Sequence, residues 1–179
     1  MIQFRNLTLA CGARRLIEGA SLQIHPGWRV GLVGANGSGK SSVFALLRGE
    51  LHADLGDCEI PAHWRIASVA QETPALQQPA IDYVLDGDTE LREIEAKLLE
   101  AEARHDAHEL GELHAQLDHI GGYGARARAA ALLKGLGFAD TDIERAVAEF
   151  SGGWRMRLNL AKALVSRCDL MLLDEPTNH

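Results

Sequence analysis

The sequence has 179 residues, of which 46% are hydrophobic and 24% are charged, as expected for a globular protein with a sizeable core. This composition excludes intrinsic disorder as the main state of the chain, and the short apolar runs exclude a membrane-spanning helix. No secretory signal is visible at the N-terminus. Cys11, Cys58 and Cys168 lack the spacing of metal ligands, so we expect reduced thiols in a cytoplasmic protein.

The formal net charge of −7 argues at first against a nucleic-acid partner. The charge is local, however, because residues 88–120 contain ten acidic and three basic residues. The rest of the chain contains equal numbers of acidic and basic residues. The sequence therefore predicts one acidic segment on an otherwise neutral domain.

Short strands are predicted near the N-terminus, where apolar residues alternate between glycine and proline turns. We expect a buried strand over residues 30–33 to run into a glycine-rich loop, followed by a helix that closes near Gly49. Another strand is predicted over residues 66–70, ending at Gln71.

The chain from about residue 81 to residue 150 is predicted to be helical, because apolar residues repeat at intervals of three and four. One helix covers the alanine-rich residues 125–136, and Thr141 and Glu144 have the capping-box spacing of a further short helix. A later helix leads into a buried strand over residues 170–173. This order of elements fits a parallel α/β sheet interrupted by helices.

The strongest motif is GANGSGKS at residues 34–41. Its glycines let the backbone curl so that several N–H groups point at one phosphate cluster, and the following helix adds its N-terminal partial charge. We expect Lys40 to reach the β- and γ-phosphates and Ser41 to bind Mg²⁺. The alternative, a flexible glycine turn, is disfavoured by the predicted strand before the loop and the amphipathic helix after it.

Two further motifs are weaker when taken alone. The run LMLLDE places Asp174 and Glu175 after a predicted strand, where Asp174 could hold Mg²⁺ and Glu175 could act on an attacking water. The sequence FSGGW opens a helix at Ser151, and its glycines let backbone amides approach an anion. The alternative interpretations are two solvated acids after a strand and an ordinary capped helix.

In this order the motifs resemble those of an ATP-binding cassette: GANGSGKS is Walker A, Gln71 is the Q-loop residue, FSGGW is the signature and LMLLDE is Walker B. The DEPTNH ending, the helical insertion after QETP and the run FSGGWRMRLNLAKAL resemble the first cassette of an ABC-F protein. The resemblance covers the whole chain. It implies an α/β fold, with a P-loop NTPase core, an N-terminal antiparallel β-subdomain and an inserted helical subdomain or arm.

The resemblance also implies ATP and Mg²⁺ as cofactors, and two cassettes that enclose two ATP molecules. The partner would be a second cassette of the same full-length chain, or a copy in a head-to-tail dimer. Gln71 and Glu175 would be catalytic, and Ser41, Gln71 and Asp174 would hold Mg²⁺. The signature residues that would contact the ATP of the other cassette are Ser151, Gly152, Gly153 and Trp154. The nucleotide-binding residues implied are Gly34, Ala35, Asn36, Gly37, Ser38, Gly39, Lys40, Ser41 and Ser42.

Two positions depart from the family pattern. Cys11 lies where an aromatic residue usually stacks on adenine, so base stacking and a strict preference for ATP over GTP are not implied. Trp154 replaces the commonest residue at the end of the signature, glutamine, and the polar contact of that glutamine is missing.

The expected domains are a β-subdomain at residues 1–28, a P-loop core at residues 29–75 and 155–179, and a helical subdomain at residues 76–154. The D-loop is incomplete at His179 and the switch histidine is missing, so we expect a fragment of a longer protein. Catalysis in this family requires groups from both cassettes. We therefore expect the isolated fragment to bind Mg-nucleotide and to hydrolyse it slowly.

Residues 88–120 have two interpretations: a solvated helical hairpin, or the ABC-F arm that docks near the ribosomal exit site. Their acidity argues against RNA binding by phosphate neutralisation, so a docked arm would contact basic ribosomal protein. A metal site built from the histidines of this segment is an alternative that no cysteine or other ligand pattern supports; those histidines are His105, His108, His114 and His119. Residues 121–167 are basic, and they either face ribosomal RNA or pair with acidic side chains.

The resemblance thus implies a cytoplasmic ATPase that acts on the ribosome, through ribosomal RNA and protein, with no membrane partner. The alternative is the ATP-binding subunit of a membrane transporter, in which a groove near Gln71 would have to receive a helix of the membrane partner. An acidic insertion follows that position instead. A kinase or GTPase is disfavoured because the sequence has no NKxD motif and has FSGG before LLDE.

Overall fold

The computed structural model describes residues 1–12, 14–69 and 74–174. By its internal contacts the chain divides into two compact units. The first unit contains Met1–Ser68 and Cys168–Asp174, and the second contains Val69–Arg167. Among the described helices, none combines the length and the apolar character needed to cross a membrane.

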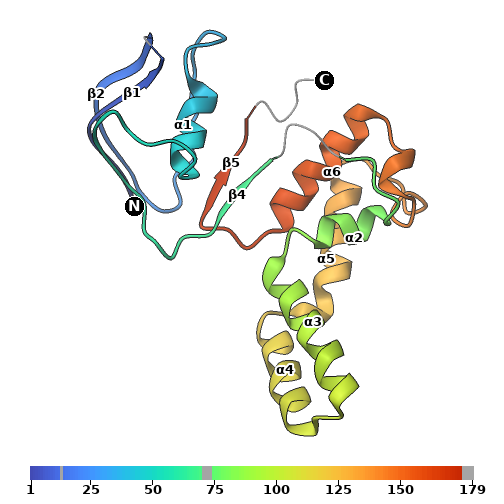
Figure 1. Cartoon of the computed structure of the whole chain (residues 1–179). Coiled ribbons are helices and arrows are strands. Elements are labelled where there is room, and N and C mark those ends of the chain that lie inside the picture. The colour runs from blue at the N-terminus through green and yellow to red at the C-terminus, as the bar shows by residue number, and fades with distance from the viewer. Residues whose placement is uncertain (13, 70–73, 175–179) are drawn as a thin grey trace. The chain divides into compact units, whose positions relative to one another are not determined.

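The first unit is built on an antiparallel sheet in the order β2-β1-β3 (Figure 1). Strand β1 (Ile2–Cys11) pairs with β2 (Arg14–Ile24) on one side and β3 (Leu55–Glu59) on the other. Apolar side chains alternate along β1, which gives the sheet one buried face. The buried residues that form this core, together with Leu172, are Ile2, Phe4, Leu7, Val43, Leu46 and Leu47. The predicted N-terminal antiparallel β-structure is confirmed.

A parallel pair of strands completes the first unit. Strand β4 (Ile66–Ser68) pairs with β5 (Leu170–Leu172) in parallel, with Ile66 opposite Leu170. Helix α1 (Lys40–Leu47) packs its buried side chains into the same core. The structure therefore confirms an α/β arrangement with parallel strands.

The prediction of a buried strand over residues 30–33 is wrong. These residues have no regular secondary structure, and their side chains are exposed, with Val33 at 90% and Val30 at 59%. An apolar strand forms only where neighbouring strands complete its hydrogen-bond ladder and side chains cover its faces. Among the described strands, β4 and β5 pair only with each other, so β5 is also less buried than predicted, with Leu172 as its one buried residue.

The second unit is helical, as predicted for residues 81–150. It contains α2 (Ala80–Leu85), α3 (Thr89–Arg104), α4 (Ala107–His119), α5 (Ala125–Gly135) and α6 (Gly152–Val165), with 3₁₀ turns at Gly122–Gly124 and Val147–Glu149. One continuous apolar core joins α2, α5 and α6 to α3 and α4. Helices α3 and α4 lie side by side and extend away from the other helices of the unit (Figure 1). We call residues 88–120 the arm.

Local side-chain chemistry sets the ends of the arm helices. Asp88 caps α3 by accepting a hydrogen bond from Leu91 N at 3.3 Å, and Asp106 caps α4 by accepting one from Glu109 N at 3.0 Å. His105 ends α3 in a left-handed conformation, with φ of 55°. His105 and Asp106 make the turn that reverses the chain between the two helices.

The short helix predicted from Thr141 and Glu144 is absent from the described residues. Turns occupy this stretch instead. The Asp142 carboxylate accepts a hydrogen bond from Ala139 N at 3.0 Å and pairs with Arg145 at 2.7 Å. These contacts, of which the hydrogen bond from Ala139 is the largest cause, lower the pKa of Asp142. Asp142 therefore stabilises a turn where the capping-box spacing predicted a helix.

Candidate nucleotide-binding site

The glycine-rich loop leads directly into α1. Gly37 and Gly39 have φ values of 73° and 102°, a region that glycine enters without steric cost. A Cβ atom at Gly34 would lie 2.6 Å from Ser38 Oγ, so the loop closes tightly on itself. No side chain caps α1, because its N-cap residue is Gly39. The first amides of α1 therefore lack a side-chain partner at the end where a helix attracts anions.

Lys40 folds back over this loop. Its Nζ atom donates hydrogen bonds to Gly34 O at 2.9 Å and to Ala35 O at 3.2 Å. The ammonium group is thus held at the loop by two carbonyl oxygens, where a phosphate could take their place. The structure places the predicted phosphate-binding lysine at the predicted loop.

Ser41 and Asp174 meet at the carboxyl end of β5. Ser41 Oγ donates a hydrogen bond to Asp174 Oδ2 at 2.8 Å, although the two residues are 133 positions apart in the sequence. A hydroxyl and a carboxylate are oxygen donors of the kind that Mg²⁺ binds, usually together with phosphate and water oxygens. The two side chains therefore fit the Mg²⁺ that the sequence motifs imply.

The charge of Asp174 also acts on Arg48, at the C-terminal end of α1. The pKa of Arg48 is raised chiefly by its hydrogen bond to Glu50, and the Asp174 carboxylate adds a smaller electrostatic contribution in the same direction. Gln71 and Glu175, the predicted catalytic residues, lie outside the described residues.

The signature residues begin α6 in the second unit. Ser151 is the N-cap residue in an extended conformation, and its side chain makes no capping hydrogen bond. Cβ atoms added to Gly152 and Gly153 would meet nothing within 4 Å, and all three residues are exposed. The first turn of α6 contains no acidic residue. This helix end is therefore open to an anion from outside.

Trp154 has a different environment from the rest of the signature. Its ring packs edge-to-face on Phe138 at 4.8 Å, and the Arg157 guanidinium lies 4.5 Å from its centre. Arg157 also donates a hydrogen bond to Leu136 O at 3.3 Å. The half-buried Trp154 thus anchors the start of α6 to the loop after α5. Sequence reasoning missed the contacts of Trp154 with Phe138 and Arg157, because these contacts depend on how α5 and α6 pack.

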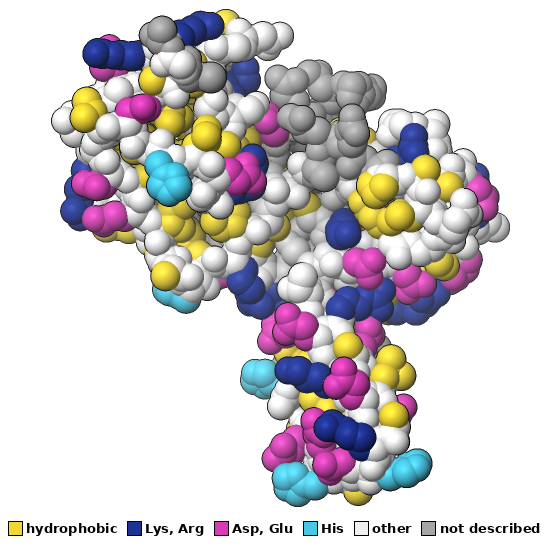
Figure 2. Space-filling view, viewed as in Figure 1, with side chains coloured by type: hydrophobic (Ala, Val, Ile, Leu, Met, Phe, Trp, Pro, Cys, Tyr) yellow, Lys and Arg dark blue, Asp and Glu magenta, His cyan; other side chains and the backbone are white. Residues whose placement is uncertain are grey.

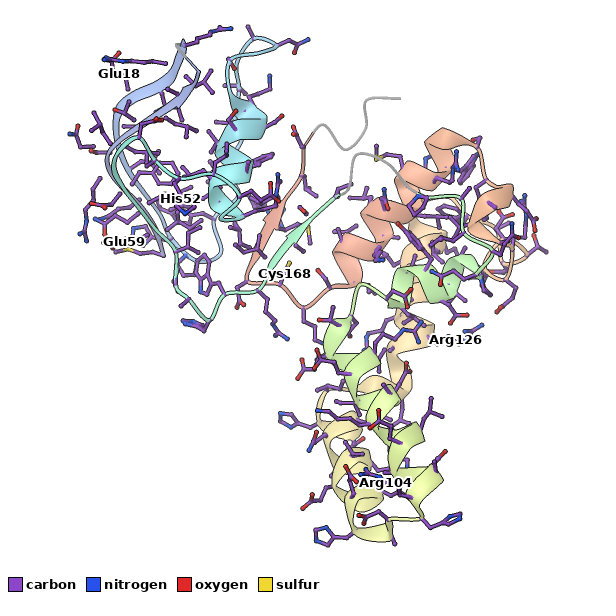
Figure 3. All side chains as sticks on the ribbon, viewed as in Figure 1. Glu18, His52, Glu59, Arg104, Arg126 and Cys168 are labelled. Carbon is purple, nitrogen blue, oxygen red and sulfur yellow. The ribbon has the colours of Figure 1, made fainter. Side chains whose placement is uncertain are left out.

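The basic segment 121–167 is largely engaged within the second unit. Arg126, on α5 in Figure 3, pairs with Glu144 and lies 3.7 Å from Asp82. Other pairs with acidic residues are Lys134–Asp140 at 3.5 Å, Arg145–Asp142 at 2.7 Å and Arg167–Asp88 at 3.1 Å. These contacts favour the interpretation in which the bases of this segment pair with acids.

The arm carries most of its acidic groups on its surface, with histidines toward its far end (Figure 2). Arg104 pairs with Glu109 at 2.6 Å near that end. His114 Nδ1 forms a hydrogen bond with the Tyr123 hydroxyl at 2.9 Å. In the described part of the chain, no group of three or more His, Cys, Asp or Glu side chains is arranged to hold a metal ion.

Comparison with known proteins identifies the family. The family described as ABC transporter matches residues 17–178, which include the glycine-rich loop, α6 and β5. The chain therefore belongs to this family, as an ATP-binding cassette with an α/β P-loop fold. It is 54% identical over 179 residues to the ATP-binding protein YheS of Escherichia coli K12, and 39% identical over 185 residues to human ATP-binding cassette sub-family F member 3. These similarities confirm the resemblance to the ABC-F type.

The chain spans 28% of the length of YheS and 25% of the human protein, while all or nearly all of the chain is matched. Solved structures show the same fold. An ABC transporter ATP-binding protein from Pyrococcus furiosus matches 99% of this chain and 76% of its own, with a TM-score of 0.69 and 16% identity. A metal-chelate type ABC transporter in an inward-facing conformation matches 98% of this chain and 60% of its own, with a TM-score of 0.62 and 23% identity.

Proposed function

We propose that the first unit binds Mg²⁺ and ATP at the glycine-rich loop, and that hydrolysis follows when a second cassette completes the site. The observation that carries this proposal is the hydrogen bond between Ser41 and Asp174. It joins the start of α1, where phosphates bind, to the end of β5, where ligands of parallel strands bind.

Each group in the site then has a distinct role. The loop amides of residues 34–42 cradle the phosphates, and Lys40 exchanges its two carbonyl partners for β- and γ-phosphate oxygens. Ser41, Gln71 and Asp174 hold Mg²⁺, which when bound neutralises charge on the phosphates. Glu175 positions and polarises the attacking water.

The signature residues complete the ATP site of another cassette. Ser151, Gly152 and Gly153 contact the γ-phosphate of ATP held by another cassette, because their helix end is open and exposed. The partner is a second cassette of the full-length chain or a head-to-tail copy. The chain alone therefore hydrolyses ATP slowly, since charge stabilisation needs groups from both cassettes.

The full-length protein acts in the cytoplasm as a ribosome-associated translation factor. Two observations support this: the similarity to ABC-F proteins and the extended α3–α4 arm. The arm occurs at the same position in the sequence as the arm of ABC-F proteins. The acidic arm surface suits contact with basic ribosomal protein better than contact with RNA phosphates.

Replacement of Asp174 by asparagine tests the nucleotide site. Asp174→Asn retains the shape of the side chain but removes the charge that attracts Mg²⁺, so we expect the gain in ATP affinity on adding Mg²⁺ to fall by about tenfold or more. A fluorescent ATP analogue titrated with and without Mg²⁺ measures this gain. Asp57→Asn, on the exposed surface of β3, is the matched control. An unchanged Mg²⁺ dependence in Asp174→Asn would contradict the proposed metal role.

Replacement of Glu175 by glutamine in the full-length protein tests the ribosome role. The variant keeps ATP bound because water activation is lost, so ATP should trap it on ribosomes. Co-sedimentation through a sucrose cushion with ATP, ADP or no nucleotide measures the trapped fraction. Equal sedimentation in all three conditions would contradict the proposed role on the ribosome.

A further inference from the structure

One arginine contacts both ends of the arm. Arg167 Nε donates a hydrogen bond to Asp88 Oδ2 at 3.1 Å, and Arg167 Nη2 donates one to Ile120 O. Asp88 is the N-cap residue of α3 and Ile120 is the C-cap residue of α4. The two places where the chain enters and leaves the arm are therefore joined through a single guanidinium group.

The Asp88 carboxylate is buried and fully engaged. Its side chain is 6% exposed, with one oxygen on Arg167 and the other on Leu91 N, at the start of α3. Loss of the guanidinium would leave a buried carboxylate without this cation, which proteins tolerate poorly. The contact is thus a strong constraint on the root of the arm, unlike the exposed ion pair of Arg104 near its far end.

Arg167 follows α6, the helix that begins with the signature. It lies two residues after the last residue of that helix, Val165. We call residues 88–94 and 117–121 the arm root. Gly87, directly before it, packs closely on α6, because a Cβ atom at Gly87 would lie 2.0 Å from Lys162 O. A helix of 14 residues moves as a nearly rigid rod. A displacement at the root of the arm therefore reaches the signature end of the same helix.

The neighbourhood of Arg167 leaves room for such a displacement. A cavity of about 200 Å³ lies beside the guanidinium, between the arm root and the ends of α5 and α6. Its lining residues are Leu85, Asp88, Ala125, Arg128, Val165 and Arg167. Space beside the guanidinium lets it shift together with Asp88 and Ile120 without displacing the surrounding core.

We propose that Arg167 is a positioning residue that couples the arm to the signature helix. The inference rests on the proposed function, because the signature responds to ATP only if it contacts the nucleotide of another cassette. When ATP engages residues 151–153, α6 becomes less mobile. Arg167 transmits the reduced mobility of α6 to Asp88 and Ile120. By thermodynamic reciprocity, a partner that holds the arm favours the ATP-engaged signature.

Arg92 provides the matched comparison. It also holds the arm root. Besides Glu95 on its own helix, at 2.8 Å, its partners lie on and next to α2: it binds Asp86 Oδ1 at 2.9 Å and Asp82 O at 3.0 Å. Removal of Arg92 loosens the root and leaves its link to α6 in place. Arg167→Lys preserves the charge beside Asp88, but a single ammonium group does not reproduce the fork that spans both ends of the arm.

The experiment measures amide hydrogen exchange in full-length protein carrying Glu175→Gln, with and without Mg·ATP. We expect ATP to slow exchange of arm-root amides, residues 88–94 and 117–121, by about fivefold or more. Arg167→Ala and Arg167→Lys should abolish this response without changing ATP affinity, and Arg92→Ala should retain it. Thermal unfolding identifies variants that do not fold. If Arg167→Ala does not fold, the conclusion is drawn from Arg167→Lys.

Three results would overturn the proposal. These are an undiminished response in the Arg167 variants, an equal loss in Arg92→Ala, and no response in a parent protein that binds ATP. A fluorescent ATP analogue measures nucleotide binding separately. If the parent protein binds no ATP, the proposed function fails and the coupling fails with it, so the two failures are distinguishable.

Discussion

Ser41 and Asp174 show how single side chains build the proposed nucleotide site. The serine lies in the first turn of α1 and the aspartate follows β5, yet their oxygen atoms are 2.8 Å apart. Each residue alone is an ordinary polar group at the end of an element. Together they form a pair of hard oxygen ligands beside a helix N-terminus, which is the chemistry that a metal-bound polyphosphate requires.

Trp154 is the residue whose structural role differs most from the rest of the signature. Its ring fills the space between Phe138 and Arg157, so Trp154→Ala should remove apolar contacts and a cation–π interaction at once. We expect a loss of about 2 kcal/mol in the free energy of unfolding of the helical unit. Denaturant unfolding followed by the helical circular dichroism signal measures it.

Trp28 supplies the control for that experiment. It is 61% exposed, and its aromatic neighbour is His25 at 5.0 Å. Trp28→Ala should change the free energy of unfolding by no more than about 0.5 kcal/mol. Equal effects of the two substitutions would show that Trp154 does not anchor the signature helix.

Among the helices, the close contact of Gly87, directly before the arm root, with α6 depends on the absence of a side chain. Gly87→Ala would place a methyl group 2.0 Å from the Lys162 carbonyl oxygen, which is backbone and has no rotamer to change. The substitution should separate α2 from α6 and lower the melting temperature of the helical unit, with a loss of about 2 kcal/mol or more.

Gly111, in the middle of α4, is the matched glycine. A Cβ atom there would meet nothing within 4 Å, and its backbone is helical. Gly111→Ala should therefore stabilise the arm by about 0.5–1 kcal/mol, because alanine loses less backbone entropy in a helix. Differential scanning calorimetry of both variants checks the opposite signs, and a loss in both would refute the packing argument.

For the whole molecule, the net charge of −7 resides on the arm. Several bases of residues 121–167 pair with acids of the same unit, and Arg126 and Arg167 reach Asp82 and Asp88 outside the segment. The arm keeps acids beyond those that its three bases can pair, and Figure 2 shows them on its surface. The helical unit therefore carries an acidic arm, which is attracted to basic protein surfaces.

Shortening of the arm separates its role from that of the nucleotide site. Replacing residues 97–114 of the full-length protein with a short Gly-Ser turn removes the far end of the hairpin and keeps Arg92, Asp88 and Ile120 at its root. ATP affinity should be unchanged, and ATP-dependent sedimentation with ribosomes should be lost. Retained sedimentation would show that the arm is not the docking element.

The sequence by itself determined the features that depend on neighbours in the chain. The helices of the second unit follow from apolar spacing, and the starts of the two arm helices follow from Asp88, Asp106 and their hydrogen bonds to amides three residues ahead. The glycine-rich loop and the family resemblance also follow from local motifs. Capping and periodicity act over one or two helical turns, so residue order is sufficient to predict them.

Tertiary structure decided the features that depend on distant partners. Residues 30–33 have the composition of a buried strand, but a strand requires a ladder that residue order does not supply. Three contacts join segments that are distant in the sequence. They are the hydrogen bond between Ser41 and Asp174, the ring contact of Trp154 with Phe138, and the contacts of Arg167 with both ends of the arm. Burial and long-range contact set these outcomes, because they depend on which surfaces meet after the helices and strands have formed.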